Sequence, residues 1–468
     1  MSHPRVTVRR VKTRIVHRCT ECGGESPRWL GRCPVCEAWG TLVEEVEVPR
    51  APTASVRTGV AGGIQGPVPI AEVDGKIATA RSTGVGELDR VLDGGLVPGS
   101  VTLLAGEPGM GKSTLLLQAL GRMAAQGARC LLVTAEESCA QVRMRAERIG
   151  ALAPNLLVVA ETALPHVLAH VDDTAPDVLA LDSIQTVLDP DLPGAPGSVT
   201  QVRDCAYRLV QQAKERALAT VIVGHVTKEG TLAGPRVLEH VVDTVLSFDG
   251  DRSHSLRLLH ALKHRFGSTH ELGLFEMTAH GLVDVPDASA RFLVDRRVGV
   301  SGSAVAPVLE GARPVLVEVQ ALVVPSEAAM PRRSASGLDS ARLSLILAVL
   351  EQRAGVQPMR ADVYASIAGG LRVAETGLDL ALALALAGAR LDRAVTDGTV
   401  AIGELGLGGE VRSVPQLERR LVEASRLGFT RALIPDSTPE RPRTGMELVP
   451  VRELREAVEY GLVPKDHG

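Results

Sequence analysis

This sequence has few aromatic residues and little net charge. Phe, Trp and Tyr make up 2% of its 468 residues, and both tryptophans, Trp29 and Trp39, lie near the N-terminus. The formal net charge of −4 excludes a global positive excess, so any nucleic-acid site must be a local patch. Hydrophobic residues at 45% and charged residues at 23% are typical of a globular protein, and the length predicts about two to four domains.

Uninterrupted apolar runs of membrane-spanning length are also missing from the sequence. The apolar-rich stretch at residues 378–389 contains Asp379 and is too short to cross a bilayer. The N-terminus is basic but lacks the apolar segment of a signal peptide. We therefore expect a cytoplasmic protein with no membrane partner.

Cysteines are few, and their spacing does not indicate a disulfide framework. Cys130, Cys139 and Cys205 are scattered among the seven, which is typical of small core or helix residues. The other four form two Cys-x-x-Cys pairs: Cys19, Cys22, Cys33 and Cys36. Each pair places two sulfurs on a tight turn, and two such turns complete a tetrahedron around Zn²⁺. Four thiolates close the coordination sphere, so the predicted zinc is structural; a redox pair or four unrelated thiols is the alternative.

Composition and periodicity divide the chain into four parts. Residues 1–18 hold six Arg or Lys and no acid, whereas residues 49–80 are rich in Pro, Gly, Ala and Thr without a helical or strand period. Farther along, apolar strands alternate with amphipathic helices, as in a mostly parallel α/β sheet. We predict a four-cysteine zinc module with a basic N-terminal arm (1–48), a linker (49–80), an α/β domain (81–290) and an α+β domain (291–468).

The most specific motif lies between a strand-like run, Val101–Ala105, and a helical run, Leu115–Leu120. It fits G-x-x-x-x-G-K-[ST], the loop that surrounds the phosphates of ATP, and it comprises Gly106, Glu107, Pro108, Gly109, Met110, Gly111, Lys112, Ser113 and Thr114. Glycines let backbone N–H groups and a helix N-terminus face the negative charge. We expect Lys112 to reach the β- and γ-phosphates and the Ser113 hydroxyl to bind Mg²⁺. A Gly-rich turn without a ligand is the alternative.

Carboxylates end two other predicted strands of the same domain. Asp182 ends the apolar run that starts at Val178, which suits a ligand of the Mg²⁺ water shell. Glu136 and Glu137 follow a strand at the sheet edge where ligands bind in such folds. We expect Glu136 to orient the attacking water, with Glu137 as the second choice; an ordinary acid at a helix N-terminus is the alternative.

Two further segments resemble a known family. Residues 83–100 (TGVGELDRVLDGGLVPGS) resemble the entry segment of RecA-type ATPases. Residues 263–267 (KHRFG) are similar to the K-N-R-F-G motif of the bacterial RadA (Sms) family, with His264 where the family has Asn. With the four-cysteine module in front, the whole chain resembles this family. The resemblance implies a RecA-like P-loop NTPase core in a hexameric ring, with Lys263 and Arg265 reaching the γ-phosphate of a neighbouring subunit.

The C-terminal part resembles the proteolytic domain of Lon, through residues 363–370 (VYASIAGG) and 403–412 (GELGLGGEVR). Lon uses a Ser–Lys dyad. Residues 375–379 (ETGLD), where its serine belongs, contain no serine, and residues 417–420 (LERR) replace the segment of its lysine. Without a nucleophile and an amine base there is no acylation chemistry. The resemblance therefore implies a proteolytically inactive scaffold for oligomerisation and DNA binding.

Several segments are candidates for DNA contact. In RecA-like ATPases mobile loops at the strand ends line a DNA channel, and the stretches 189–198 and 225–234 match that position, the second starting at His225, a possible nucleotide sensor. The basic arm and Trp29 suit single strands, because cations and aromatic platforms bind them. The candidate cations are Lys228, Arg236, Arg353, Arg360, Arg412, Arg419 and Arg420. Ordinary surface loops, a satisfied core histidine and solvated basic faces are the alternatives.

The phosphate loop and the cysteine module predict an ATPase that uses ATP, Mg²⁺ and Zn²⁺. The resemblance to the RadA family implies that it is a DNA-dependent ATPase of homologous recombination, which translocates on single-stranded DNA, binds branched DNA and stimulates branch migration after RecA-mediated strand invasion in break repair. Two alternatives remain: an ATP-dependent Lon-like protease, and a RecA-like regulatory ATPase of the circadian-clock type that does not act on DNA.

Overall fold

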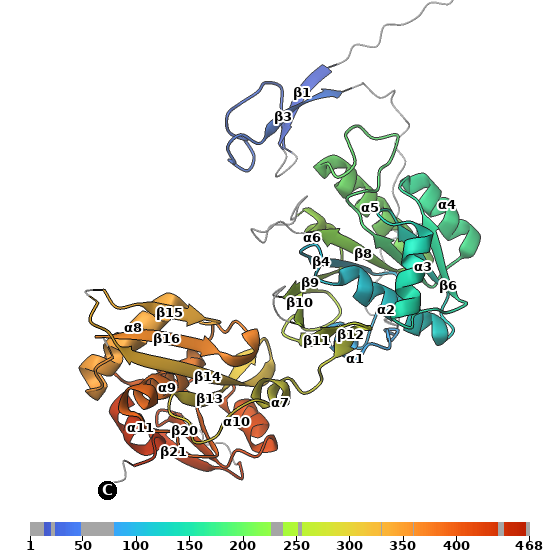
Figure 1. The fold of residues 1–468 in the computed structure, drawn as a ribbon. Helices are drawn as coiled ribbons and strands as arrows, with labels where there is room; N and C mark the ends of the chain where they lie inside the picture. Colours follow the sequence, from blue (N-terminus) through green and yellow to red (C-terminus); the bar gives the residue numbers. More distant parts are fainter. Residues whose placement is uncertain are drawn as a thin grey trace, which may run out of the picture. The chain divides into compact units, whose positions relative to one another are not determined.

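The computed structural model describes residues 14–19, 24–47, 79–225, 237–250, 255–328, 330–358, 360–438 and 444–464. The chain forms two compact units: Met1–Thr269 with Gly273–Asp284, and His270–Leu272 with Val285–Gly468. The fold is mixed α/β (Figure 1).

A small antiparallel sheet forms the N-terminal module. Its strands are β1 (Arg14–Cys19), β2 (Glu25–Ser26) and β3 (Leu42–Glu47), in the order β2-β1-β3. The buried apolar cluster of this module consists of Cys19, Cys33 and Leu42. So small a cluster supplies little hydrophobic stabilisation, and small domains of this kind depend on a bound metal to fold.

A nine-stranded sheet forms the centre of the α/β domain, in the order β12-β11-β10-β9-β4-β8-β7-β5-β6. Strands β4 to β9 are parallel neighbours, whereas β10 runs antiparallel to β9, and β12 antiparallel to β11. The strands are β4 (Val101–Gly106), β5 (Cys130–Thr134), β6 (Leu156–Ala160), β7 (Val178–Asp182), β8 (Ala219–His225), β9 (Thr244–Gly250), β10 (Leu256–His264), β11 (Leu272–Thr278) and β12 (Gly281–Asp284).

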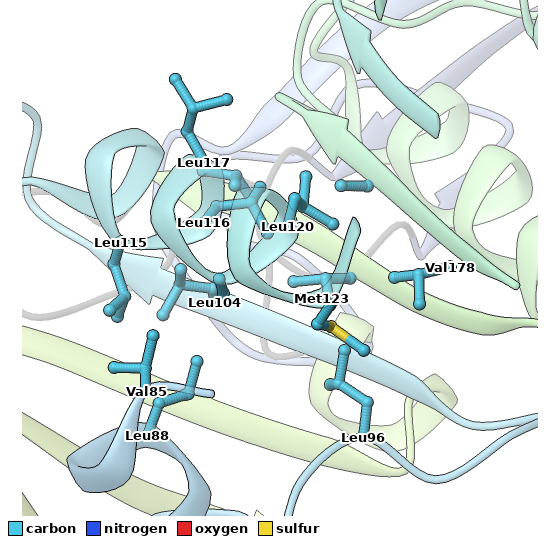
Figure 2. Packing of buried hydrophobic residues seen from close by; sticks show 14 of the residues in the cluster. Val85, Leu88, Leu96, Leu104, Leu115, Leu116, Leu117, Leu120, Met123 and Val178 are labelled. Atoms are coloured by element: carbon cyan, nitrogen blue, oxygen red, sulfur yellow. The ribbon is translucent and has the colours of Figure 1, made fainter. Parts of the chain in front are cut away.

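Helices cover both faces of this sheet and bury a separate apolar cluster on each. Leu104 packs with residues of α2, including Leu116 and Leu120 (Figure 2). Leu103 points to the opposite face and packs with α4 and α5, because neighbouring strand residues face opposite ways. The helices are α1 (Gly86–Val91), α2 (Lys112–Ala125), α3 (Cys139–Arg148), α4 (Leu164–Thr174), α5 (Val199–Arg216) and α6 (Val237–Val241).

The second unit has a seven-stranded mixed sheet, in the order β15-β16-β14-β13-β17-β20-β21, and a two-stranded sheet, β18-β19. Its strands are β13 (Ser303–Glu310), β14 (Arg313–Pro325), β15 (Arg333–Ser336), β16 (Ala361–Ile367), β17 (Thr399–Ala401), β18 (Glu404–Leu405), β19 (Val411–Arg412), β20 (Arg431–Pro435) and β21 (Glu447–Val451). The helices are α7 (Ala288–Leu293), α8 (Ser340–Ala354), α9 (Asp379–Leu391), α10 (Leu417–Arg426) and α11 (Leu454–Gly461), with short 3-10 turns η2 (Ala368–Gly370) and η3 (Thr376–Leu378). The Leu/Ala-rich helix α9 is buried from Asp379 to Gly388 and packs against β13 and β14.

In the described ranges, no helix is long and apolar enough to cross a membrane. The expected fold class, an α/β RecA-like core with a small zinc module and a Lon-like α+β domain, is confirmed.

Candidate nucleotide and metal sites

The phosphate loop connects β4 to α2 and is shaped by two close approaches. A Cβ added at Gly106 would lie 2.3 Å from the carbonyl oxygen of Phe248, and one at Gly111 would lie 2.5 Å from Cε of Met277. Gly111 also has φ 107°, a conformation that side chains other than glycine rarely adopt. These positions therefore require glycine, because strands β9 and β11 press against the loop.

Lys112 points its amine into the loop. Its Nζ donates to the carbonyl oxygens of Gly106 at 2.7 Å and Glu107 at 2.9 Å. Burial lowers the pKa of Lys112 to about 8, although nearby carboxylates, Asp182 first among them, act in the opposite direction. The amine is thus fixed close to the acidic groups of the site.

Ser113 and Asp182 meet across the loop. Asp182 ends β7, and Ser113 lies in the first turn of α2. The carboxylate of Asp182 accepts a hydrogen bond from the Ser113 hydroxyl. Burial raises the pKa of Asp182, and the bond from Ser113 opposes this rise. A hydroxyl and a carboxylate are hard oxygen donors, so this pair fits the coordination of Mg²⁺.

The structure distinguishes Glu136 from Glu137. Glu136 accepts a hydrogen bond of 2.6 Å from the Ser183 hydroxyl, and its Oε1 lies 3.1 Å from Nε2 of His225 at the end of β8. Burial favours its neutral form, but the bonds to Ser183 and His225 hold the pKa of Glu136 below its usual value. Glu137 forms an ion pair with Arg145 on α3 instead. Only Glu136 therefore faces the group around Lys112.

Lys263 and Arg265 lie away from this group within the same chain. Lys263 pairs with Val245 on β9, which pairs with Leu103 near the start of β4. The phosphate loop begins at the other end of β4, so strand spacings put Lys263 roughly 15 Å from Gly106. The four residues Lys112, Ser113, Asp182 and Glu136 converge, and the two cations of the KHRFG segment do not join them.

Both of these cations have partners in their own subunit. The Lys263 amine donates to the carbonyl oxygens of Glu239 and Val242, each at 2.7 Å, at the C-terminal end of α6. Burial lowers the pKa of Lys263, and the charge of Arg265 adds to this effect. Arg265 lies 3.6 Å from the buried carboxylate of Asp243, and its side chain remains about half exposed.

His264, the departure from the family motif, is held at the sheet. Its Nδ1 lies 3.0 Å from the Thr244 hydroxyl, and its ring packs edge-on against Phe266 with centroids 6.2 Å apart. Gly267 is required next to it, because an added Cβ would lie 2.7 Å from Cβ of Asp93.

The zinc module brings three of the predicted ligands together. The sulfurs of Cys19, Cys33 and Cys36 lie within 4.8 Å of one another, and those of Cys19 and Cys36 are 3.6 Å apart. Cys22, the fourth predicted ligand, lies outside the described residues. Thiolates at this separation fit one tetrahedral Zn²⁺.

In the second unit, the segments where a Lon-type dyad belongs do lie together, but they hold an ion pair. Glu375 pairs with Arg420, whose side chain is fully buried. Arg420 also donates to the carbonyl oxygens of Pro307 at 2.9 Å and Pro415 at 3.0 Å. The prediction of Arg420 as a phosphate contact is therefore wrong, because its guanidinium does not reach the surface.

The remaining candidates for DNA contact are four arginines of the second unit, the cations that lie outside the described residues, and one loop. Arg353, Arg360, Arg412 and Arg419 are exposed or nearly so. Lys228, Arg236 and the basic arm before Arg14 lie outside the described residues. The stretch 189–198 is anchored, since the Gln201 amide donates to the carbonyl oxygens of Asp189 at 3.1 Å and Leu192 at 3.0 Å.

Sequence reasoning missed two residues at the nucleotide site. Ser183, next to Asp182, binds Glu136, and Arg257 on β10 donates to the Met110 carbonyl oxygen. A hydroxyl directly after the strand-end carboxylate was a signal for the first. Arg257 gave none, because its contact joins residues far apart in the sequence.

Three parts of the chain match models of known families. Residues 81–158 match the family model of the KaiC ATPase, residues 17–44 that of a rubredoxin metal-binding domain, and residues 352–438 that of subunit ChlI of Mg-chelatase. The chain is similar to proteins named DNA repair protein RadA from three organisms. The identity is 47% with that of Streptococcus pyogenes serotype M6 (91% of this chain, 93% of the relative), 43% with that of Bacillus subtilis (96% and 99%) and 46% with that of Pseudomonas aeruginosa (96% and 99%).

The fold and the converging site define a RecA-like P-loop ATPase that carries a zinc module and a Lon-like domain. ATP and Mg²⁺ belong to the ATPase core and Zn²⁺ to the cysteine module, as predicted. The chain belongs to the RadA family.

Proposed function

We propose that this chain is a DNA-dependent ATPase that processes intermediates of homologous recombination. It translocates along single-stranded DNA, in the manner of a helicase, and stimulates branch migration of RecA-mediated strand exchange during the repair of DNA breaks. The name of its relatives, DNA repair protein, supports the repair role. The observation that carries the motor part is the position of Lys263 and Arg265, at the opposite end of the sheet from their own phosphate loop.

Each part of the chain has a role in this proposal. Residues 1–48 form the zinc module with Cys19, Cys22, Cys33 and Cys36 as ligands, and residues 49–80 form a linker. Residues 81–290 form the motor, and residues 291–468 form an inactive Lon-like scaffold. The cofactor-binding residues are Gly106, Glu107, Pro108, Gly109, Met110, Gly111, Lys112, Ser113, Thr114 and Asp182.

Hydrolysis follows from the arrangement of the convergent residues. The lowered pKa of Glu136 keeps this carboxylate ionised, so that it can orient a water molecule against the γ-phosphate and accept its proton. The water oxygen bonds to the γ-phosphorus as the bond to the bridging oxygen breaks, which yields ADP and phosphate. Lys112 holds the β- and γ-phosphates. Mg²⁺, held by Ser113 and Asp182, neutralises phosphate charge when it is bound.

Lys263 and Arg265 complete the site of a neighbouring subunit. Because each chain offers a phosphate loop on one side of its sheet and two cations on another, a head-to-tail ring satisfies every site. Such cations stabilise the charge that develops on the transferred phosphoryl group. The Lys263 amine also contacts the end of α6. Its binding to the phosphate of the neighbouring subunit therefore ties hydrolysis to movement within its own subunit. A hexamer is the ring size we propose.

The partners in this proposal are single-stranded and branched DNA, RecA and further copies of the chain. The protein acts in the cytoplasm, where these partners are found, and uses no membrane. Exposed Arg353, Arg360, Arg412 and Arg419 are the candidates for DNA contact on the second unit.

ATP hydrolysis with and without single-stranded DNA tests the proposal. We expect DNA to raise turnover of the wild type, and Lys112→Ala and Lys263→Ala each to lower the stimulated rate about a hundredfold or more, because a phosphate ligand or a trans cation is lost. Lys214→Ala, an exposed lysine near the end of α5, is the matched control and should keep the wild-type rate. Stimulated turnover that survives in both site variants would contradict the motor assignment.

The two alternative functions predict other results. A Lon-like protease would need a nucleophile and base where the buried Glu375–Arg420 pair stands, so we expect no ATP-dependent degradation of casein. A regulatory ATPase that ignores DNA would show the same turnover with and without single strands.

A further inference from the structure

Three neighbouring strands, β9, β10 and β11, contact the phosphate loop. Strand β9 approaches Gly106 through the Phe248 carbonyl, and β11 approaches Gly111 through Met277. The third contact comes from β10, where the Arg257 Nε donates to the Met110 carbonyl oxygen at 3.1 Å. Of the three, only the Arg257 contact is a directional hydrogen bond from a side chain to the loop itself.

Arg257 is built into its position. The residue is 6% exposed, and its Nη1 also donates to the Leu256 carbonyl oxygen at 2.8 Å. Its cross-strand partner is Gly250, where a Cβ would lie 2.7 Å from Cδ of Arg257. A glycine opposite the arginine therefore leaves the room that the side chain needs to reach the loop. A buried guanidinium is retained only where hydrogen bonds compensate its lost hydration.

The other end of β10 carries the cations that we assign to the neighbouring site. Lys263 lies six positions after Arg257, which corresponds to about 20 Å along a strand. A bulge interrupts the strand between them, since Ala261 pairs with Leu246 and Lys263 with Val245. The extra residue, Leu262, is 60% exposed.

This bulge decides which way Lys263 points. Leu246 and Ala261 belong to the apolar cluster that includes α2, whereas Val245 belongs to the cluster on the opposite face, together with Leu238 and Val242 around α6. Paired residues share a face, so the added residue turns Lys263 to the side of α6. Without the bulge, Lys263 would lie on the same face as Arg257.

We propose that Arg257 is a positioning residue that holds the phosphate loop in its phosphate-binding shape. We further propose that β10 thereby links the loop of one subunit to the cations that it offers to the next. The second half rests on the proposed function, because it requires Lys263 to act across an interface. One strand contacts both places, so a shift of Met110 on nucleotide binding changes the position of β10 at its far end as well.

Steady-state ATP hydrolysis by the full chain with Arg257→Leu and Arg257→Lys tests the positioning role. Leucine removes the bond to Met110, and we expect KM for ATP to rise about tenfold, as for the loss of one hydrogen bond to a charged donor. Lysine retains one donor, so it should recover part of the loss. Direct binding of a fluorescent ATP analogue should weaken by the same factor.

Arg129→Leu is the matched control, since Arg129 also donates to a backbone carbonyl oxygen, that of Thr174 at 2.9 Å, in the same domain. We expect this variant to keep the wild-type KM. A KM within twofold of wild type for Arg257→Leu would overturn the positioning role, as would an equal rise in Arg129→Leu, because that would indicate a general loss of structure.

The link along β10 has a separate readout. If β10 couples neighbouring sites, the Hill coefficient for ATP should fall towards one in Arg257→Leu, and an unchanged coefficient overturns the link. Failure of the proposed function is distinguishable, since it would show as wild-type turnover in Lys263→Ala. That result would leave the KM effect of Arg257→Leu, and hence the positioning role, standing.

Discussion

The Glu375–Arg420 pair lies in the segments where the resemblance places a Lon-type dyad. Arg420 is fully buried and contacts Glu375 and two backbone carbonyls. Glu375 in turn accepts a bond of 2.6 Å from the Leu309 N–H. The pair ties β13, the segment before η3 and α10 together. A site of this kind is structural, and removing one partner leaves a charge without compensation.

Arg420→Leu should therefore destabilise the second unit by about 3–5 kcal/mol, because Glu375 is left without its counter-charge. Calorimetric unfolding of the full chain measures this as a lower transition temperature for that unit. Arg419→Leu, an exposed neighbour on the same helix, is the control and should change stability by less than about 0.5 kcal/mol. Equal effects of the two variants would contradict the structural role of the pair.

For single residues, a local sequence motif was enough to identify some site residues, but it could not decide between two neighbouring candidates. The phosphate loop and the Cys-x-x-Cys pairs are local patterns, so Lys112 and Cys19 could be identified directly. Glu136 and Glu137 are neighbours, and only the fold shows that one faces Ser183 and the other Arg145. The burial of Arg420 was beyond sequence reasoning because its partner is 45 positions away.

Among the elements, the zinc module exposes two large aromatic side chains. Trp29 and Trp39 are 62% and 76% exposed, and the Arg32 guanidinium lies 6.0 Å from the centre of the Trp39 ring. Large exposed aromatic rings beside a cation are suited to stacking against unpaired bases. The module holds both tryptophans of the chain, so their fluorescence reports on this element alone.

Binding of an oligothymidylate should quench this tryptophan fluorescence, because stacked bases accept the excitation of the indole. Trp39→Ala should lower the affinity by about one stacking contribution, 1–3 kcal/mol, at unchanged salt dependence. Removal of zinc by a chelator should abolish the quenching, since the module needs the metal to fold. An oligomer of abasic sugar phosphate is the control, and quenching by it would argue against stacking.

The strands β4, β5, β7 and β8 could be predicted because buried parallel strands form short apolar runs. The order of the strands could not. The position of β10 next to β9 determines that Arg257 touches the loop and that Lys263 does not. Such long-range pairing depends on the whole sheet, and local sequence carries no signal for it.

For the whole molecule, the composite site that we propose between neighbouring subunits predicts complementation between inactive variants. Glu136→Gln lacks its hydrolytic carboxylate but keeps Lys263, and Lys263→Ala has the reverse defect. Mixed in equal amounts, they should regain DNA-stimulated hydrolysis at about a quarter of the sites of a randomly mixed head-to-tail ring. Each variant alone should stay inactive.

A mixture of Glu136→Gln with Lys112→Ala is the control, since both lesions lie in the same half-site and no combination repairs it. Absence of recovery in the first mixture, with rings shown to exchange subunits, would contradict a composite site.

The contacts of Lys263 have a consequence for how much ATP the cell uses. In a separate chain its amine is already satisfied by the end of α6. Under the composite site that we propose, a chain without neighbours lacks a complete reaction centre, and it should not hydrolyse ATP. ATP hydrolysis would begin only when chains assemble into a ring. The number of rings formed on damaged DNA, and not the amount of protein made, would then set the rate at which ATP is used.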